Sequence, residues 1–247
     1  MTKDPVKKMN VPFNSRNATA LTMMMFSSKP DFNDSSKSRQ DHKMEEYRKI
    51  INNFVCIFVI ESVSFTLANA TFHAAYSYIE HARRVGLKFE CVEIELLRDK
   101  KGDYQKLLTL CSDASELSVD VNYRRNFTFD GFDQFNMDYL SIHALHNIKW
   151  LTVDNICALL NCSRLSVDVN WRDKDFNQFL KFLMKSDGRL TWLTFYNNRE
   201  INPQVVLNGI NSIVRVRNEV FEIQRANGVR IKVTYEWFHR KLEVSNI

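Results

Sequence analysis

The sequence predicts an α/β fold, an irregular leucine-rich-repeat-like stack of short strands and helices that ends in a C-terminal β-hairpin. The first observation is a repeated string, Leu-Ser-Val-Asp-Val-Asn, at 117–122 and again at 165–170. The second is a strand–helix–strand rhythm with the intervals typical of repeat proteins. The third is Asn227-Gly228, a strong tight-turn signal between two apolar segments. Repeat architectures usually present an extended binding surface.

The beginning of the chain differs in composition from the rest. Residues 1–43 read as a disordered or poorly structured leader, because they mix Ser, Asn, Asp and Lys without hydrophobic periodicity. The apolar segment 21–26 is the exception, and such a segment can dock on the main body or on a partner. We therefore divide the chain into a leader, 1–43, and one folded domain, 44–247. Ten Lys and Arg against six Asp and Glu place +4 of the net charge of +5 within residues 1–50.

Hydrophobic periodicity predicts the elements that precede the repeat. The clearest of them is a helix that buries Phe72, Ala75, Tyr76 and Ile79 and ends before a glycine. A partly alternating segment after it has the period of a half-buried strand. In order, the expected elements are a helix at 43–51, strands at 54–60 and 62–67, a helix at 71–85, a strand at 89–96 and a helix at 104–111.

A recurring strand pattern follows: an apolar residue, Ser or Thr, a second apolar residue, and usually a polar residue. It occurs at 117–120, 140–143, 151–154, 165–168 and 193–196. The longest interval holds a helix at 173–185, with Phe176, Phe179, Leu180 and Leu183 on one face.

The pattern predicts a partner-binding surface. Side chains alternate along a strand, so the apolar positions should enter a shared core while the polar positions face outward. Stacked strands would then align the polar side chains on one exposed face. The candidate residues are Ser118, Asp120, Ser141, His143, Thr152, Asp154, Ser166, Asp168, Thr194 and Tyr196.

The C-terminal segment 219–235 predicts a hairpin around the Asn-Gly turn. Phe221 and Ile223 are expected to face the core, together with the apolar residues of the second strand. Three cationic side chains are expected to face water and to protect an edge strand from pairing. They are Arg225, Arg230 and Lys232.

The sequence lacks the motifs of common enzymes and cofactor sites. It contains no G-x-G-x-x-G, G-x-x-x-x-G-K, H-E-x-x-H or G-x-S-x-G motif, and its six glycines leave little for phosphate-binding loops. None of the five cysteines forms a C-x₂-C pair, so they read as small buried hydrophobes in a reducing compartment. We therefore expect no enzymatic activity, no cofactor and no metal.

The same reading bounds location and alternative functions. No signal peptide is visible and the apolar run 54–60 is too short to span a bilayer, so we expect an intracellular protein, cytoplasmic or nuclear, without a membrane partner. One alternative is a small hydrolase-like enzyme that uses His143, Asp120 and Asp168, although nothing in the sequence brings these groups together. Another is nucleic-acid binding through the basic leader, which the nearly neutral remainder of the chain disfavours.

Three segments carry a family resemblance. Residues 148–167 include Leu-Thr-Val-Asp-Asn-Ile-Cys-Ala-Leu-Leu-Asn, residues 175–195 include Asp-Phe-Asn-Gln-Phe-Leu-Lys-Phe-Leu, and residues 221–231 read Phe-Glu-Ile-Gln-Arg-Ala-Asn-Gly-Val-Arg-Ile. They resemble the F-box-associated domain of the expanded nematode F-box protein families. The resemblance is best over 148–233 and extends toward residue 54.

The resemblance implies a non-enzymatic protein-recognition module that captures targets for a cullin-based ubiquitin ligase. In that family an N-terminal F-box docks on a Skp-type adaptor. Residues 1–50 show no recognisable F-box pattern, so no F-box residue is carried over to this chain. We expect a protein target as partner, and an adaptor and cullin only if an F-box is present.

Overall fold

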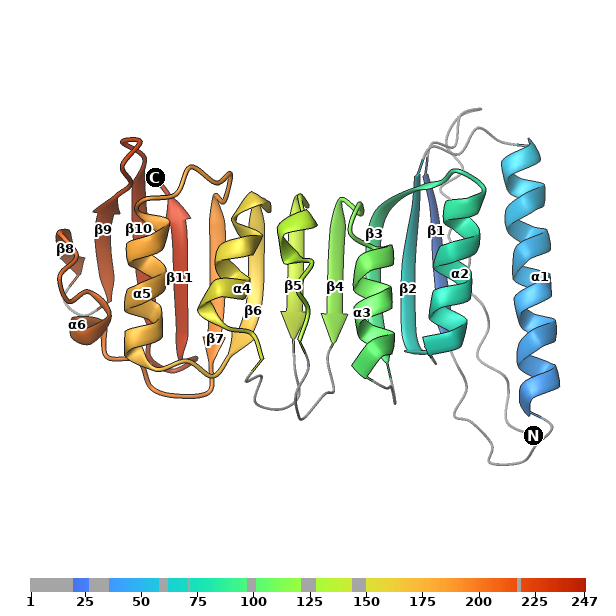
Figure 1. The fold of residues 1–247 in the computed structure, drawn as a ribbon, viewed down its shortest axis with the longest axis horizontal. Coiled ribbons are helices and arrows are strands. Elements are labelled where there is room, and N and C mark those ends of the chain that lie inside the picture. The colour runs from blue at the N-terminus through green and yellow to red at the C-terminus, as the bar shows by residue number, and fades with distance from the viewer. Residues whose placement is uncertain are drawn as a thin grey trace. The chain divides into compact units, whose positions relative to one another are not determined.

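The computed structural model describes residues 20–26, 36–57, 62–70, 72–96, 101–120, 128–143, 150–216 and 219–247. The chain divides into two compact units, Met1–Asn122 and Tyr123–Ile247. Figure 1 shows the helices and strands of both. Both combine a β-sheet with helices, which confirms the α/β class. The leucine-rich-repeat-like character and the division at residue 43 stay predictions. No helix among the described residues is long and apolar enough to cross a membrane.

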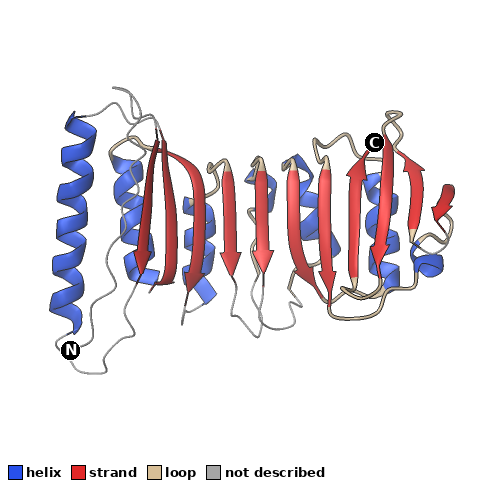
Figure 2. Ribbon diagram, turned by 180° about the vertical axis from the view of Figure 1, so that it is seen from behind, coloured by secondary structure: helices blue, strands red, loops and turns tan. Residues whose placement is uncertain are grey.

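The first unit is a parallel sheet in the order β1-β2-β3-β4 with a helix in each crossover. Parallel neighbours cannot be joined by a tight turn, so each connection contains a helix. Helices α2 and α3 cover one side of this sheet, and the view from behind shows its other side without a helix (Figure 2). The elements are β1 Ala20–Phe26, α1 Ser36–Ile57, β2 Ser62–Ala70, α2 Phe72–Arg84, β3 Lys88–Leu96, α3 Lys101–Leu110 and β4 Glu116–Asp120.

Alternation along β2 explains the core of the first unit. Val63, Phe65 and Leu67 are fully buried, while the Ser and Thr residues between them are half-buried on the opposite side. Helix α2 covers the apolar side with Ala75 and Ile79, both fully buried. The predicted strands at 62–67 and 89–96 and the predicted helices at 71–85 and 104–111 are therefore confirmed, with ends that differ by a few residues.

Helix α1 corrects the prediction for residues 54–60. Residues 54–57 continue a helix that begins at Ser36, so the predicted strand is wrong there, and residues 58–60 lie outside the described residues. A short apolar run fits a buried strand and a helix equally well, and tertiary packing decides between them. Here Tyr47 of α1 packs edge-on against Tyr78 and donates a hydrogen bond to the Tyr78 carbonyl over 3.2 Å.

The same contact changes the predicted buried face of α2, since Tyr78 is buried while Phe72 and Tyr76 are only half-buried.

Two parts of the predicted leader are ordered elements. Residues 20–26 form β1, which pairs in parallel with β2, and residues 36–43 begin α1. An unstructured leader is therefore wrong for these two segments. Residues 1–19 and 27–35 lie outside the described residues, as does most of the basic segment on which the nucleic-acid alternative depends.

The second unit is a mixed sheet in the order β5-β6-β7-β11-β10-β9-β8. Strands β5, β6 and β7 are parallel, and the remaining neighbours are antiparallel. Helices α4 and α5 lie on one side of this sheet (Figure 1). The elements are η1 Phe132–Gln134, β5 Tyr139–His143, α4 Val153–Ala158, η2 Leu159–Asn161, β6 Arg164–Val169, α5 Asp173–Leu183, β7 Trp192–Asn197, α6 Pro203–Val206, β8 Ser212–Val216, β9 Val220–Gln224, β10 Arg230–Glu236 and β11 Lys241–Asn246.

An aromatic cluster forms the core of the second unit on the helix-covered side. Phe176 and Phe179 of α5 pack edge-on against Phe195 of β7, with ring centroids 5.4 and 5.3 Å apart. Trp171 closes the cluster and donates its indole N–H to the carbonyl of Leu151 over 2.8 Å. The predicted strands at 140–143, 165–168 and 193–196 and the helix at 173–185 are confirmed.

Residues 151–154 are the exception among the repeated segments, because they do not form a strand. Thr152 is the N-cap of α4: its side chain accepts a hydrogen bond from the backbone N–H of Asn155, and the Asn155 side-chain oxygen accepts one from the backbone N–H of Thr152. Such a capping box satisfies two donors at a helix start, and Asp154 in the first turn suits the helix dipole. The string therefore starts a helix although it resembles the strand pattern.

The C-terminal hairpin is confirmed as β9 and β10, but its surroundings differ from the prediction. Strand β8 pairs with β9 and β11 pairs with β10, so neither hairpin strand lies at an edge. Arg230 and Lys232 are exposed as predicted. Arg225 is buried instead, because its guanidinium donates to the carbonyls of Gly188 and Leu190, each over 3.1 Å.

Candidate functional site

The side of the second unit's sheet that faces away from α4 and α5 carries the candidate site; we call it the open face (Figure 2). Strand register aligns its side chains in three rows across β5, β6, β7 and β11. The arginine row is Tyr139, Arg164, Trp192 and Ser245; the hydroxyl row is Ser141, Ser166, Thr194 and Glu243; the histidine row is His143, Asp168, Tyr196 and Lys241.

The hydroxyl row is part of the floor of the open face and does not protrude. Ser141, Ser166 and Thr194 are only 2%, 4% and 0% exposed, so their predicted exposure is wrong. Their side chains are short, and each lies between the larger side chains two positions before and after it on the same strand. These three residues therefore define the shape of the surface, and the two flanking rows present the groups that a partner can contact.

The histidine row places a titratable pair beside an exposed aromatic ring. His143 Nδ1 lies 3.5 Å from Asp168 Oδ1, and both side chains are partly exposed. The Tyr196 ring is 38% exposed and its centroid lies 6.0 Å from that of His143. These three predicted residues are therefore brought together on one surface, as the pattern predicted.

Lys241, at the β11 end of the histidine row, is paired with two glutamates: Glu243 of the hydroxyl row and Glu236 of β10. Lys241 Nζ lies 2.9 Å from Glu243 Oε2 and 3.2 Å from Glu236 Oε1. The hydrogen bond from Lys241 holds the pKa of Glu236 below its usual range. Partial burial lowers the pKa of Lys241, but hydrogen bonds and charge attraction from the two carboxylates outweigh it and leave that pKa raised. This end of the open face is charged and internally paired.

The arginine row is the part of the surface that sequence reasoning missed. Arg164 lies over the Tyr139 ring, 5.3 Å from its centroid, and Trp192 is half-buried beside it. Each of these residues lies two positions before the Ser or Thr of a predicted strand. Extending the alternating pattern of each predicted strand by two residues toward the amino terminus would have identified them.

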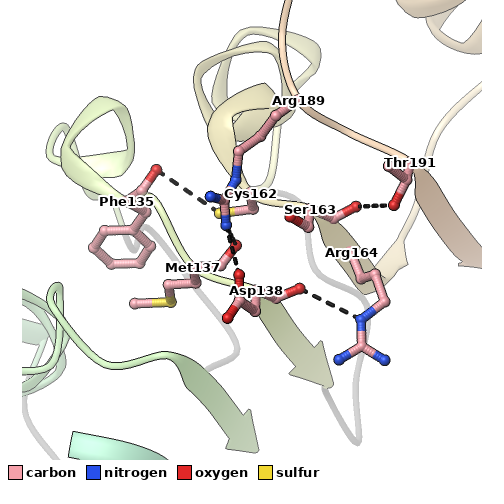
Figure 3. A network of polar contacts seen from close by, with 8 residues as sticks. All are labelled: Phe135, Met137, Asp138, Cys162, Ser163, Arg164, Arg189 and Thr191. Carbon is pink, nitrogen blue, oxygen red and sulfur yellow. Dashed lines mark hydrogen bonds and ion pairs between the residues drawn. The ribbon is translucent and has the colours of Figure 1, made fainter.

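A polar network holds the ends of β5, β6 and β7 in place (Figure 3). Arg189 donates to the carbonyl of Met137 and to the carboxylate of Asp138, each over 2.8 Å. The Arg164 Nε–H donates to the Asp138 carbonyl over 3.4 Å, and the Thr191 hydroxyl donates to the Ser163 carbonyl over 2.9 Å. The three strands enter the sheet at positions that this network sets, so the open face is a preformed surface.

The remaining predicted residues belong to other elements. Thr152 and Asp154 are at the start of α4 and do not join the open face. Ser118 and Asp120 lie on β4 of the first unit. There the register aligns them with two glutamates of β3, Glu93 and Glu95 respectively.

The uncovered side of the first unit's sheet is acidic around Cys91. Burial, together with the negative charges of the nearby carboxylates Glu93, Glu116 and Glu90, raises the pKa of the Cys91 thiol to about 11. Thr66 donates to the Glu93 carboxylate over 3.0 Å. A thiol with a raised pKa is a poor nucleophile at neutral pH. Among the described residues no group of three or more His, Cys, Asp and Glu side chains is arranged to hold a metal ion.

The comparison with known protein families agrees with the predicted resemblance. A family model described as F-box associated matches residues 128–195. The match begins before the predicted stretch at 148, and it ends at Phe195, before the hairpin that also suggested the family. It covers β5, β6, α5 and most of β7, the elements that carry most of the open face. A search of curated proteins found no match.

Proposed function

We propose that this chain is a non-enzymatic protein-recognition module that binds a protein target through the open face. The supporting observation is the pair of polar and aromatic rows on a sheet whose other side is closed by a packed aromatic core. Trp, Tyr and Arg are the side chains that contribute most to protein interfaces, and the open face presents Trp192, Tyr196 and Arg164 together. The F-box-associated match includes β6 and most of β7, with Arg164 and Trp192, and it ends one residue before Tyr196.

The family match supports a more specific role, as the substrate-recognition part of a cullin-based ubiquitin ligase. In that role a Skp-type adaptor would join the chain to the cullin through an F-box, where one is present. The proposed location is intracellular, cytoplasmic or nuclear, since that is where such ligases act. Of the residues named for the hydrolase alternative, His143 and Asp168 are close together in the second unit, and Asp120 is on β4 of the first unit.

Quantitative affinity purification tests the recognition proposal. The bait is the full chain, compared with a variant that combines Arg164→Ala, Trp192→Ala and Tyr196→Ala. Phe182→Ala is the control, because Phe182 is a half-exposed aromatic residue of α5 on the opposite side of the unit. A specific target should be enriched by the wild type and the control, and should be recovered about tenfold less by the triple variant.

Two outcomes separate the parts of this proposal. An unchanged set of recovered proteins with the triple variant would refute the open face as the binding surface. Recovery of a target without any Skp-type adaptor or cullin would leave the recognition function and remove the ligase role. Hydrolysis of an ester substrate by the wild type that is lost in His143→Ala would favour the enzyme alternative.

A further inference from the structure

A basic pocket lies on the helix-covered side of the second unit, away from the open face. It has a volume of about 560 Å³ and opens between the C-terminal half of α5, the loop before β8 and the end of β9. Lys181 and Lys185 line it from α5, and Arg225 lines it from the hairpin. No Asp or Glu is among its lining residues, so the pocket carries three positive charges.

Arg225 is the residue that points to a ligand. It is only 5% exposed, and its two terminal nitrogens donate to backbone carbonyls, those of Gly188 and Leu190. Its Nε has no hydrogen-bond partner in the described part of the chain. The guanidinium is hydrogen-bonded to neutral carbonyls, and burial lowers the pKa of Arg225 in spite of the attraction from Asp187. A further anion close to Nε would therefore stabilise the charged form.

The walls of the pocket are held by hydrogen bonds that do not use its cationic groups. The Asn177 side chain donates to the carbonyls of Val206 and Asn208, which fixes the loop before β8 against α5. The Ala226 backbone N–H donates to the carbonyl of Met184 over 2.7 Å, which fixes the hairpin turn against the end of α5. The pocket is therefore preformed, and the ammonium of Lys181 lies over Gly209 at its rim.

Strand β8 begins directly at this pocket and forms the edge of the sheet. Asn211 lines the pocket and Ser212 is the first residue of β8. The strand order ends at β8, so one side of its backbone is not paired within the described sheet. Its apolar side chains are unusually exposed: Ile213 and Val214 at 58% each. An exposed apolar edge strand is a template for pairing with another extended segment.

We propose that β8 and the basic pocket together bind an extended, acidic peptide segment of a partner protein. The segment adds a strand to the free edge of β8, its apolar side chains cover Ile213 and Val214, and an acidic side chain at the end near Asn211 enters the pocket. Its carboxylate accepts hydrogen bonds from Lys181, Lys185 and the Nε–H of Arg225. Backbone pairing supplies affinity without sequence preference, and the pocket selects for the acidic residue.

This site shares no residue with the open face, so it does not depend on the function proposed above. The two can fail separately: the open-face triple variant should bind an acidic strand peptide normally. Conversely, substitutions in the pocket should leave capture through the open face intact.

Fluorescence anisotropy with labelled peptides tests the proposal on the full chain. The probes are octapeptides of alternating Val and Thr that carry two Glu residues at either the amino or the carboxyl end. Both designs are used because the added strand can run parallel or antiparallel to β8. Matched peptides carry Gln in place of Glu. One Glu peptide should bind the wild type, and its Gln counterpart should bind about tenfold more weakly or not at all.

Variants then assign the binding to this site. Lys181→Glu combined with Lys185→Glu should lower the affinity for the acidic peptide about tenfold or more, because both ammonium groups are replaced by carboxylates. The control combines Lys174→Glu and Lys232→Glu, two exposed lysines outside the pocket that change the net charge equally. Ile213→Ser combined with Val214→Ser should lower the affinity for the peptide while leaving the charges of the pocket unchanged.

Three outcomes would overturn the proposal. Equal binding of the Glu and Gln peptides would remove the role of the pocket. Unchanged binding by the Lys181/Lys185 variant, or equal loss in the control, would place the peptide elsewhere. Inorganic phosphate that binds as tightly as the peptide and is unaffected by the β8 variant would make the pocket a free-anion site without strand addition.

Discussion

Thr194→Val tests how the open face is built, because Thr194 occupies the centre of its hydroxyl row. The residue is fully buried, and its hydroxyl has no hydrogen-bond partner among the described residues. Valine keeps the shape and volume of threonine and replaces the hydroxyl by a methyl group. The substitution should therefore stabilise the protein by about 1–2 kcal/mol, the usual cost of burying an unpaired hydroxyl.

Urea unfolding followed by circular dichroism measures the effect. The midpoint should rise at constant slope, and the melting temperature should rise by about 2–4 °C for each kcal/mol in a chain of this size. Thr194→Ser is the control: it keeps the hydroxyl and removes a buried methyl group, so it should destabilise by about 1 kcal/mol. A Thr194→Val protein less stable than the wild type would show that the hydroxyl has a partner, and the reasoning would be refuted.

Three further predictions follow from buried and charged groups. Asn197→Ala should destabilise by about 3 kcal/mol in urea unfolding, since the buried Asn197 amide bonds both the N–H and the carbonyl of Trp171; a loss under 1 kcal/mol would contradict this. Lys241→Met should reduce stability most between about pH 5 and pH 10, where both Lys241 and Glu236 are charged. The stabilisation by this ion pair is lost at low pH, when Glu236 is protonated below its lowered pKa, and at high pH, when Lys241 is deprotonated above its raised pKa. A pH-independent difference between the two proteins would argue against the pairing. Alkylation of Cys91 by iodoacetamide, followed by mass spectrometry, should accelerate with pH until its pKa of about 11, and a plateau near pH 9 would contradict the raised pKa.

Local patterns predicted most elements because their signals lie within a few residues of one another. Alternation placed the strands at 140–143, 165–168 and 193–196, and helical spacing placed the buried phenylalanines of α5. The Asn-Gly turn located the hairpin of β9 and β10. Each of these signals is a property of backbone geometry, which repeats every two or 3.6 residues whatever the rest of the chain does.

The errors occurred where one local string satisfies two structures. Residues 54–57 are apolar and fit a strand, but they continue α1, whose Tyr47 is anchored on α2. Residues 151–154 match the strand pattern, but Thr152 and Asn155 form a capping box, and α4 begins there instead of a strand. The alternation also failed to show that Ser141 and Ser166 are buried, since exposure depends on the size of neighbouring side chains on adjacent strands.

The sequence by itself determined the α/β class, the alternation that puts His143, Asp168 and Tyr196 on one side of their strands, and the F-box-associated resemblance, which the family match at residues 128–195 supports. Only the tertiary structure decided which strands are neighbours. It inserted β11 between β7 and β10, and it buried Arg225 against Gly188 and Leu190. These pairings join residues that are far apart in the chain, and their free energy comes from shared burial and hydrogen bonding that no short window of sequence contains.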